Sequence, residues 1–327
     1  MSKPLISVVM ANYNTPIEYL REAIDSILNQ TYSDFELIIV DDGSTDASVS
    51  YIESLTDDRI VFLKNERNLG QPKTRNRAID VAKGEYIAIM DSDDIALPTR
   101  FEKQVAFMES NPDVIVCGTW FEKFGIESIV RKPVIFDFEL YRCQLIFENS
   151  PITLCHPSAM LRKSMLEKYG IRYDETYLRS QDYRLWNICS RYGRMAILEE
   201  VLLKYRTHDK QISTSSFADQ MSCVDQISGK QLSDIGVAYG EEFVRWRRGM
   251  VSGADEYIRY YDWLESIKDA NKNTRLYKQE SLQKYIEIMK YKGLKRLSKK
   301  KAVKLLFKTN GPKRKLVFNF LINKKQN

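Results

Sequence analysis

The sequence predicts an α/β fold with a mainly parallel central sheet, and three observations indicate it. Short apolar runs alternate four times with segments of helical periodicity in the N-terminal third of the chain. Some runs, such as 5–10 (LISVVM) and 35–40 (FELIIV), are apolar at consecutive positions, as strands buried on both faces are. Polar or acidic residues follow these runs, at the strand ends where open parallel sheets bind ligands.

The elements follow one another in a regular order. After the first strand, Thr15-Pro16-Ile17-Glu18 matches a capping box, with Thr15 as the N-cap and Glu18 reaching back to it. Apolar residues then recur at helical spacing up to Leu28 and form one stripe. Further strands are expected over 35–40, 60–63, 86–90 and 114–120, with helices over 47–55, 72–82 and 98–110.

The alternation is lost beyond residue 125, although 179–192 has a helical pattern. After residue 216 the sequence is helical, polar and aromatic, and we expect Trp246 and Trp263 to anchor its packing. We therefore predict an α/β domain over 1–215, a helical extension over 216–289 and a basic amphipathic tail over 290–327.

The composition is that of a soluble globular protein. With 327 residues, of which 43% are hydrophobic and 29% charged, the chain can bury a core, which excludes fibrous and wholly disordered classes. No membrane-spanning run and no secretory signal pattern are found, so we expect a cytoplasmic protein. The five scattered cysteines predict reduced thiols, and two histidines are too few for a His-rich zinc site.

The net charge of +6 hides a division of charge along the chain. Residues 290–327 contain 14 Lys and Arg and no Asp or Glu, whereas the first 289 residues carry a net charge of −8. Apolar residues lie among these lysines, which allows three interpretations: contact with an anionic membrane, a solvated tail, or nucleic-acid binding. No nucleic-acid-binding module is recognisable, so we predict no nucleic-acid partner and favour an anionic membrane surface.

Two acidic clusters are candidate ligand-binding residues. Asp41 and Asp42 follow the second strand, and Asp91, Asp93 and Asp94 follow the fourth. Both clusters are expected on one rim, because the carboxyl ends of parallel strands share an edge of the sheet. A lone Asp-x-Asp more often starts a turn or caps a helix, but the second cluster favours a divalent cation held by carboxylates and substrate phosphates.

Taken together, these segments resemble those of inverting family 2 nucleotide-sugar glycosyltransferases of the bacterial surface-polysaccharide type. The resemblance covers about residues 5–205, and it implies a GT-A fold, a UDP-sugar donor and a bound Mn²⁺ or Mg²⁺. The matching segments are SVVMANYN at 7–14, SILNQT at 26–31, ELIIVDDGSTD at 36–46, NLGQPKTRNR at 68–77, GEY at 84–86 and DSDD at 91–94.

The resemblance implies which residues bind the nucleotide. Ala11, Asn12 and Tyr13, which follow the first strand, would line the pocket of the base. Asp42 would bond the uracil, and Asp41 lies beside it. These assignments come from the matching positions and not from the spacing of the residues.

The same resemblance assigns the diphosphate and metal contacts. Arg75 would approach the diphosphate, although the residues alone also allow it to be an ordinary surface residue of a helix. Asp91 and Ser92 would contact the nucleotide, while Asp91 and Asp93 would hold the metal. Asp94 would support these residues from behind.

A carboxylate base is needed, because an attacking sugar hydroxyl must lose its proton as the new bond forms. The family carries this base in a Glu-Asp pair followed by Leu-Trp, and Gln181-Asp182 with Leu185-Trp186 matches it, with Gln in place of Glu. Asp182 is therefore the predicted base, against the alternative of an exposed helical Asp. The substitution puts only the auxiliary role of Gln181 in doubt.

The two histidines have structural and functional interpretations. His156 lies in a segment resembling the one before the family's acceptor site, but a lone histidine is as often a satisfied core residue. His208 matches a C-terminal histidine that related enzymes place near the metal or diphosphate, and we include it among the candidate metal ligands.

The prediction is therefore a metal-dependent inverting glycosyltransferase at the inner face of the cell membrane. It would transfer a sugar from a UDP-sugar to a hydroxyl of a polyprenyl-diphosphate-linked glycan, forming a β-glycosidic bond in O-antigen, capsule or exopolysaccharide synthesis. A nucleotidyltransferase is disfavoured because residues 5–14 lack glycine, and an NAD-dependent oxidoreductase because GxGxxG is absent. A non-catalytic nucleotide-sugar-binding module is the remaining alternative.

Overall fold

The computed structural model describes residues 4–135, 137–147, 154–208, 217–247 and 250–323. The chain divides into two compact units. The first unit comprises Met1–Phe138 and Ile152–Cys223, and the second comprises Glu139–Pro151 and Val224–Asn327. These bounds differ from the expected ones, because apolar residues of 139–147 and of the basic tail pack in the core of the second unit.

The first unit is built on a nine-stranded sheet. Its strands are β1 (Ile6–Asn12), β2 (Phe35–Asp41), β3 (Ile60–Lys64), β4 (Tyr86–Asp91), β5 (Ile95–Ala96), β6 (Val114–Gly125), β7 (Ile129–Arg131), β8 (Met160–Arg162) and β9 (Arg194–Thr207). The strand order is β3-β2-β1-β4-β8-β6-β9-β5, and β7 pairs with β6.

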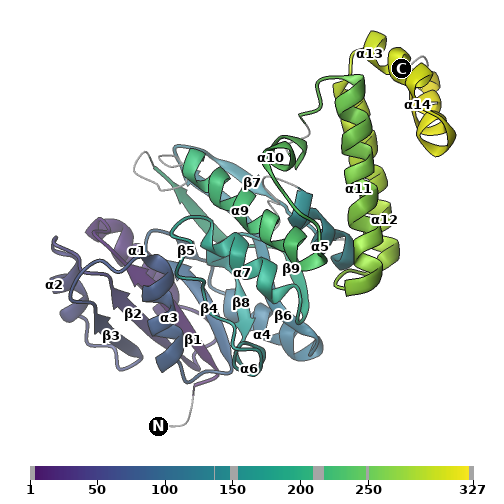
Figure 1. The fold of residues 1–327 in the computed structure, drawn as a ribbon. Helices are drawn as coiled ribbons and strands as arrows, with labels where there is room; N and C mark the ends of the chain where they lie inside the picture. The colour runs from purple at the N-terminus through teal and green to yellow at the C-terminus, as the bar shows by residue number, and fades with distance from the viewer. Residues whose placement is uncertain (1–3, 136, 148–153, 209–216, 248–249, 324–327) are drawn as a thin grey trace. The chain divides into compact units, whose positions relative to one another are not determined.

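The predicted α/β fold is confirmed, and its parallel part is the N-terminal half. Strands β3, β2, β1 and β4 lie side by side and pair in parallel (Figure 1). The other half is mixed, since β8 runs antiparallel to both β4 and β6, whereas β6 and β9 are parallel. A helix follows each of the first three strands and leads to the next strand, and such crossovers are what parallel neighbours require.

Helices cover both faces of the sheet. Those of the first unit are α1 (Ile17–Leu28), α2 (Ser48–Glu53), α3 (Gln71–Val81), α4 (Arg100–Ser110), α6 (Lys163–Lys168) and α7 (Gln181–Cys189). Alternate β1 residues Ile6, Val8 and Met10 share a buried cluster with Leu20 of α1 and Phe101 of α4. Helix α3 packs on β1 and β2. This arrangement leaves the carboxyl ends of β1, β2 and β4 at one edge, where the loops carry polar residues.

The start of α1 corrects one expectation. Pro16 is the N-cap, and no side chain caps the helix, so the predicted capping box does not form. The Thr15 hydroxyl instead lies 2.7 Å from the Ser92 hydroxyl. Thr15 therefore connects the loop after β1 to the DSDD motif after β4, a tertiary contact that local helix rules do not anticipate.

The second unit is helical. It contains most of α5 (Phe138–Phe147) and α9 (Phe217–Ile235), followed by α10 (Glu241–Arg247), α11 (Ala254–Thr274), α12 (Gln279–Arg296), α13 (Lys299–Lys308) and α14 (Gly311–Asn323). The predicted anchors Trp246 and Trp263 pack against each other, with ring centroids 5.6 Å apart. Helices α13 and α14 add Leu305, Val317 and Phe320 to the same core.

The basic tail is thus partly structural. Lys290 is buried and contacts Glu265 at 2.5 Å and Glu287 at 2.6 Å. Lys308 pairs with Asp255 of α11 at 2.7 Å. Among the described residues, no helix is both long and apolar enough to cross a membrane.

A buried polar contact joins β1, β2 and the loop before β4 at the amino ends of these strands, away from the acidic motifs. The Ser7 hydroxyl donates to Glu36 at 2.6 Å and accepts the backbone N–H of Gly84 at 2.8 Å. A Cβ on Gly84 would lie 2.5 Å from the Ser7 nitrogen and 2.7 Å from the Ile6 carbonyl carbon. The backbone of β1 therefore leaves no space for a side chain at this position.

We expect Gly84→Ala to lower the free energy of unfolding by about 1–3 kcal/mol, since backbone must shift to relieve the overlap. Chemical denaturation measures this. The matched control is Gly240→Ala, whose Cβ would meet no atom within 4 Å. Equal stabilities of the two variants would contradict the close approach.

Candidate functional site

The loops after β1 and β2 are connected by Asn12 and Asp41, both of which are buried. The Asn12 amide donates to the Asp41 carboxylate at 2.8 Å and to the Ser48 hydroxyl at 3.0 Å. Asp41 also accepts the hydroxyl of Ser44 at 2.5 Å and the backbone N–H of Gly43 at 3.1 Å. Asn12 and Asp41 are therefore buried residues that support the loops predicted to line the base pocket.

Asp42 is also buried, and it holds the loop that leads into α3. Its carboxylate accepts the Asn65 amide and the Leu69 N–H, both at 2.8 Å, and the Gly70 N–H at 3.0 Å. Gly70 has a φ of 90°, a conformation that favours glycine, and this brings its N–H to the carboxylate. Asp42 thus positions the NLGQPKTRNR segment.

Two residues after β1 remain accessible. Tyr13 is 49% exposed, and Ala11 is partly buried. Asn14, with a φ of 49°, accepts the Thr45 N–H at 2.8 Å and donates its own N–H to Ser44 at 2.9 Å. The turn that carries Tyr13 is therefore tied to the loop after β2, and it leaves an aromatic ring free to contact a ligand.

Arg75 of α3 reaches the end of β4. Its guanidinium donates to Asp91 at 2.7 Å and to Gln71 at 3.2 Å, and the residue is only 3% exposed. Arg75 is therefore not a surface residue, which removes the alternative that the sequence left open. Burial alone would raise the pKa of Asp91, but the charge of Arg75 and the neighbouring His156 hold it well below its usual range.

His156 lies close to Asp91, the residue that Arg75 binds. Its Nε2 lies 2.8 Å from the Tyr173 hydroxyl, and its Nδ1 lies 3.8 Å from Asp91. The ring also lies 6.1 Å from that of Trp186. Burial raises the pKa of Tyr173, so its hydroxyl stays protonated at neutral pH.

Asp93 and His208 form a second contact, with Oδ2 and Nε2 3.1 Å apart. Burial, with the charge of Asp91, raises the pKa of Asp93. Burial raises the pKa of Asp94 further above its usual value, and Asp94 accepts the Arg206 N–H at 2.8 Å. Asp94 thus joins β9 to the DSDD motif from within the protein.

The side chains of Asp91, Asp93 and His208 fit a divalent cation. No three His, Cys, Asp or Glu side chains converge as a complete metal site in the described part of the chain. Asp93 can offer an oxygen ligand and His208 a nitrogen ligand. One oxygen of Asp91 is already bonded to Arg75, which leaves its other oxygen as a ligand. Mg²⁺ and Mn²⁺ are commonly held by one or two carboxylates together with substrate phosphates, so an incomplete protein ligand set agrees with such an ion.

Asp182 lies in the first turn of α7 and is partly exposed. It has no hydrogen bond or ion pair with the described residues, unlike Asp41, Asp42 and Asp91. The charges of Asp182 and Asp91 both raise the pKa of Tyr173, after burial. Asp182 is therefore a carboxylate without a hydrogen-bond or ion-pair partner among the described residues.

Gln181 connects α7 to those residues. Its amide donates to Gln71 at 2.7 Å, and Gln71 in turn accepts from Arg75, which binds Asp91. A chain of contacts therefore links Gln181, which precedes the predicted base in the sequence, to Asp91 of the DSDD motif. A glutamine can donate to the Gln71 oxygen, which an ionised glutamate could not do.

Sequence reasoning missed Tyr173, Gln71 and Arg206. Arg206 donates to the backbone carbonyl of Asp93 at 2.7 Å and packs over the ring of Tyr19, 4.2 Å from its centroid. Gln71 lies in the NLGQPKTRNR segment and Arg206 lies two residues before His208, but only the fold brings these side chains and Tyr173 to the acidic residues. The spacing of Gln71 and Arg75, four residues apart on a helix, is a local signal for their contact.

Comparison with known proteins shows the family of this chain. The family model described as Glycosyl transferase family 2 matches residues 7–170. The chain belongs to this family. The protein is therefore a glycosyltransferase, which excludes a nucleotidyltransferase as its main class.

Relatives and solved structures extend this result. An uncharacterized glycosyltransferase of Methanocaldococcus jannaschii is 45% identical over 63% of this chain and 72% of its own length. The Escherichia coli UDP-Glc:alpha-D-GlcNAc-diphosphoundecaprenol beta-1,3-glucosyltransferase WfaP is 30% identical over 66% of this chain and 82% of its own. The UDP complex of S. aureus TarS 1-349 shares the fold, with a TM-score of 0.55, 17% identity and coverage of 88% and 90%.

Proposed function

We propose that this glycosyltransferase transfers a sugar from a UDP-sugar to a hydroxyl of a lipid-linked glycan, with inversion at the anomeric carbon. The proposal rests on the unpaired carboxylate of Asp182, which follows Gln181 in the chain, and Gln181 is linked through Gln71 to Arg75 and Asp91. A base without a partner is able to accept a proton from a substrate.

The donor and acceptor classes have support from named relatives. WfaP and WfgD of Escherichia coli, 30% and 28% identical to this chain, are named as enzymes that use UDP-Glc and a GlcNAc-diphosphoundecaprenol acceptor. Donors and acceptors of these chemical classes are therefore the first to test here. The corresponding role is assembly of a bacterial surface polysaccharide, such as O-antigen, capsule or exopolysaccharide.

The chain's own residues account for the steps. Tyr13 would contact the base, and Arg75 would approach the diphosphate from α3. Asp182 would take the proton of the acceptor hydroxyl as its oxygen attacks the anomeric carbon and the bond to the diphosphate breaks. A divalent cation held by Asp93, His208 and Asp91 would supply charge neutralisation for the diphosphate when bound. No covalent intermediate is needed, so an α-linked donor would give a β-linked product.

We expect Asp182→Asn to lower kcat by about 10²–10⁴-fold, because the amide cannot accept the proton, with little change in UDP affinity. Transfer from a UDP-sugar panel to a synthetic lipid diphosphate glycan measures this. Asp25→Asn, an exposed aspartate of α1, is the control. Activity retained in the Asp182 variant, or an α-linked product from an α-linked donor by NMR, would exclude this mechanism.

We expect UDP with Mn²⁺ to raise the thermal stability of the protein, and UDP alone to have little effect. At about 100 times its dissociation constant, a ligand stabilises by about 2.7 kcal/mol. Asp93→Ala should remove the metal-dependent part, because it deletes one proposed ligand, whereas the control Asp25→Ala should keep it. Full stabilisation by UDP in the presence of a chelator would contradict the metal assignment.

The proposed location is the inner face of the cell membrane, with α13 on an anionic surface. Lys300, Val303, Lys304 and Phe307 are exposed, and their spacing places them on one face of the helix. Phe307 is 79% exposed, whereas Leu305 on the other face is buried in the core. Apolar and basic side chains together suit an interfacial contact with anionic lipid.

We expect Val303→Ser combined with Phe307→Ser to weaken binding to vesicles that contain phosphatidylglycerol by about tenfold or more, because less apolar area can leave water. Flotation of protein with vesicles measures this. Ile126→Ser, which removes an apolar residue that is 65% exposed in the first unit, is the control. If the double variant and the control bind equally, α13 is not the contact.

A further inference from the structure

The second unit contains a cavity of about 560 Å³ with a mainly cationic lining. Its volume lies within the range of small-molecule pockets. Four of its nine lining residues are Lys or Arg, and one is Glu. The lining residues are Glu139, Arg142, Asn271, Lys272, Arg275, Leu276, Tyr277, Lys278 and Gln279.

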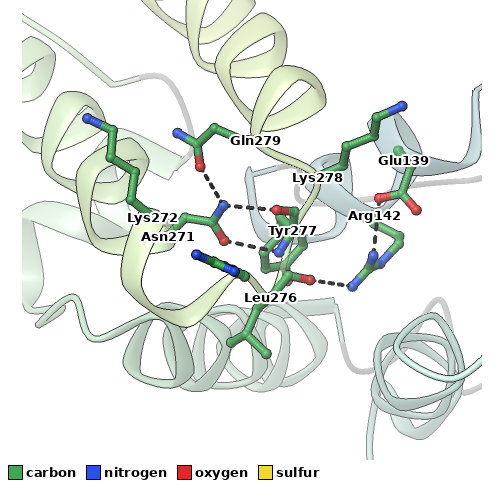
Figure 2. A pocket seen from close by; sticks show the side chains of 9 residues that line it. Glu139, Arg142, Asn271, Lys272, Leu276, Tyr277, Lys278 and Gln279 are labelled. Carbon is green, nitrogen blue, oxygen red and sulfur yellow. Dashed lines mark hydrogen bonds and ion pairs between the residues drawn. The ribbon is translucent and has the colours of Figure 1, made fainter.

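The loop between α11 and α12 is held firmly. The Asn271 amide nitrogen donates to the Tyr277 carbonyl at 2.9 Å, and the Asn271 oxygen accepts the Tyr277 N–H at 3.0 Å (Figure 2). The same nitrogen donates to the Gln279 side chain at 2.8 Å. The Tyr277 hydroxyl and Gln231 lie 3.0 Å apart. Residues 275–278 are therefore presented in a fixed conformation, which lowers the entropic cost of binding a ligand.

The cations of the lining differ in what they contact. Arg142 is fixed by Glu139 at 3.1 Å and by the Leu276 carbonyl at 2.7 Å. Lys272 pairs with Asp269 at 2.7 Å, and Figure 2 shows it pointing away from Lys278.

The side chains of Arg275 and Lys278 have no hydrogen bond or ion pair among the described residues, and both residues are exposed. Two unneutralised cations therefore flank a cavity that a third, fixed cation also lines.

The loop joins the C-terminal end of α11 to the N-terminal end of α12. Arg275 has a φ of 52° and a ψ of 28° at the C-cap of α11, a left-handed conformation usually taken by glycine. The negative end of the α11 dipole accounts for a cation there, but not for Arg142 and Lys278, which belong to other elements. Lys278 is the N-cap of α12, whose first turn has no side-chain cap and so leaves N–H donors open.

We propose that this cavity binds a phosphate-bearing anion, with Arg275, Lys278 and the first turn of α12 as its contacts and Arg142 as a fixed charge beside them. Arg side chains and helix N-termini both suit phosphate oxygens. The site lies wholly in the second unit, so the inference does not depend on the proposed donor site. The phosphate can be free in solution or part of a lipid headgroup.

The test uses the full chain, with inorganic pyrophosphate and with a short-chain phosphatidic acid dispersed as monomers, in chelator, by isothermal titration calorimetry. Arg275→Gln combined with Lys278→Gln should raise the Kd of the bound probe by about tenfold or more. The control Lys284→Gln removes an exposed lysine of α12 outside the cavity and should leave the Kd within about twofold. Both altered side chains are exposed, so circular dichroism should show an unchanged fold.

The outcomes distinguish a free phosphate from a lipid headgroup, and binding in this cavity from binding in the donor site. Binding of pyrophosphate that the double variant loses indicates a free phosphate, and binding of phosphatidic acid alone indicates a lipid headgroup. Asp93→Ala, in the donor site, should bind the probe as the natural chain does. No binding of either probe, equal loss in the control, or loss in the Asp93 variant would overturn the proposal, whereas a failed proposed function would leave these results unchanged.

Discussion

The ion pair between Arg75 and Asp91 is the interaction on which the rest of the site depends. A carboxylate cluster at the end of a buried strand is unfavourable, because burial and mutual repulsion both oppose ionisation. Arg75 compensates one carboxylate, and the pKa of Asp91 falls. The pKa values of Asp93 and Asp94 are raised instead, by burial and by the charges of the neighbouring carboxylates. Arg75 and His156 therefore favour the charged form of Asp91 within this cluster.

The loops around the Arg75–Asp91 pair are held by hydrogen bonds to buried carboxylates. Asn12 and Asp41 connect the ends of β1 and β2, and Asp42 gathers the N–H groups before α3. Many, though not all, of the buried polar atoms here are hydrogen-bonded: Asn12 Oδ1 and Arg75 Nε have no partner among the described residues. Asp182 forms no hydrogen bond or ion pair with the described residues, and for that reason we propose it as the base.

The second unit follows a different principle. Its aromatic core includes Trp246, Tyr257 and Tyr260, and its helices carry the excess of basic residues. Part of that charge is neutralised within the unit, as Lys290 and Lys308 show. Other basic residues are exposed, among them Lys300 and Lys304 of α13 and Arg275 and Lys278 at the loop between α11 and α12. The unit therefore presents exposed cations both on a helix face and beside a cavity.

Local sequence determined the first four strands, the helices between them and the identity of the acidic motifs, because apolar periodicity and strand-end residues are properties of short segments. It also indicated the family through the order of those motifs. Only the tertiary structure decided that Thr15 bonds Ser92 and does not cap α1, that Arg75 is buried on Asp91, and that His156 and Tyr173 join them. Tertiary structure also placed residues 139–147 in the second core. These contacts join residues far apart in the chain, and their free energy comes from burial and charge compensation, which no local pattern records.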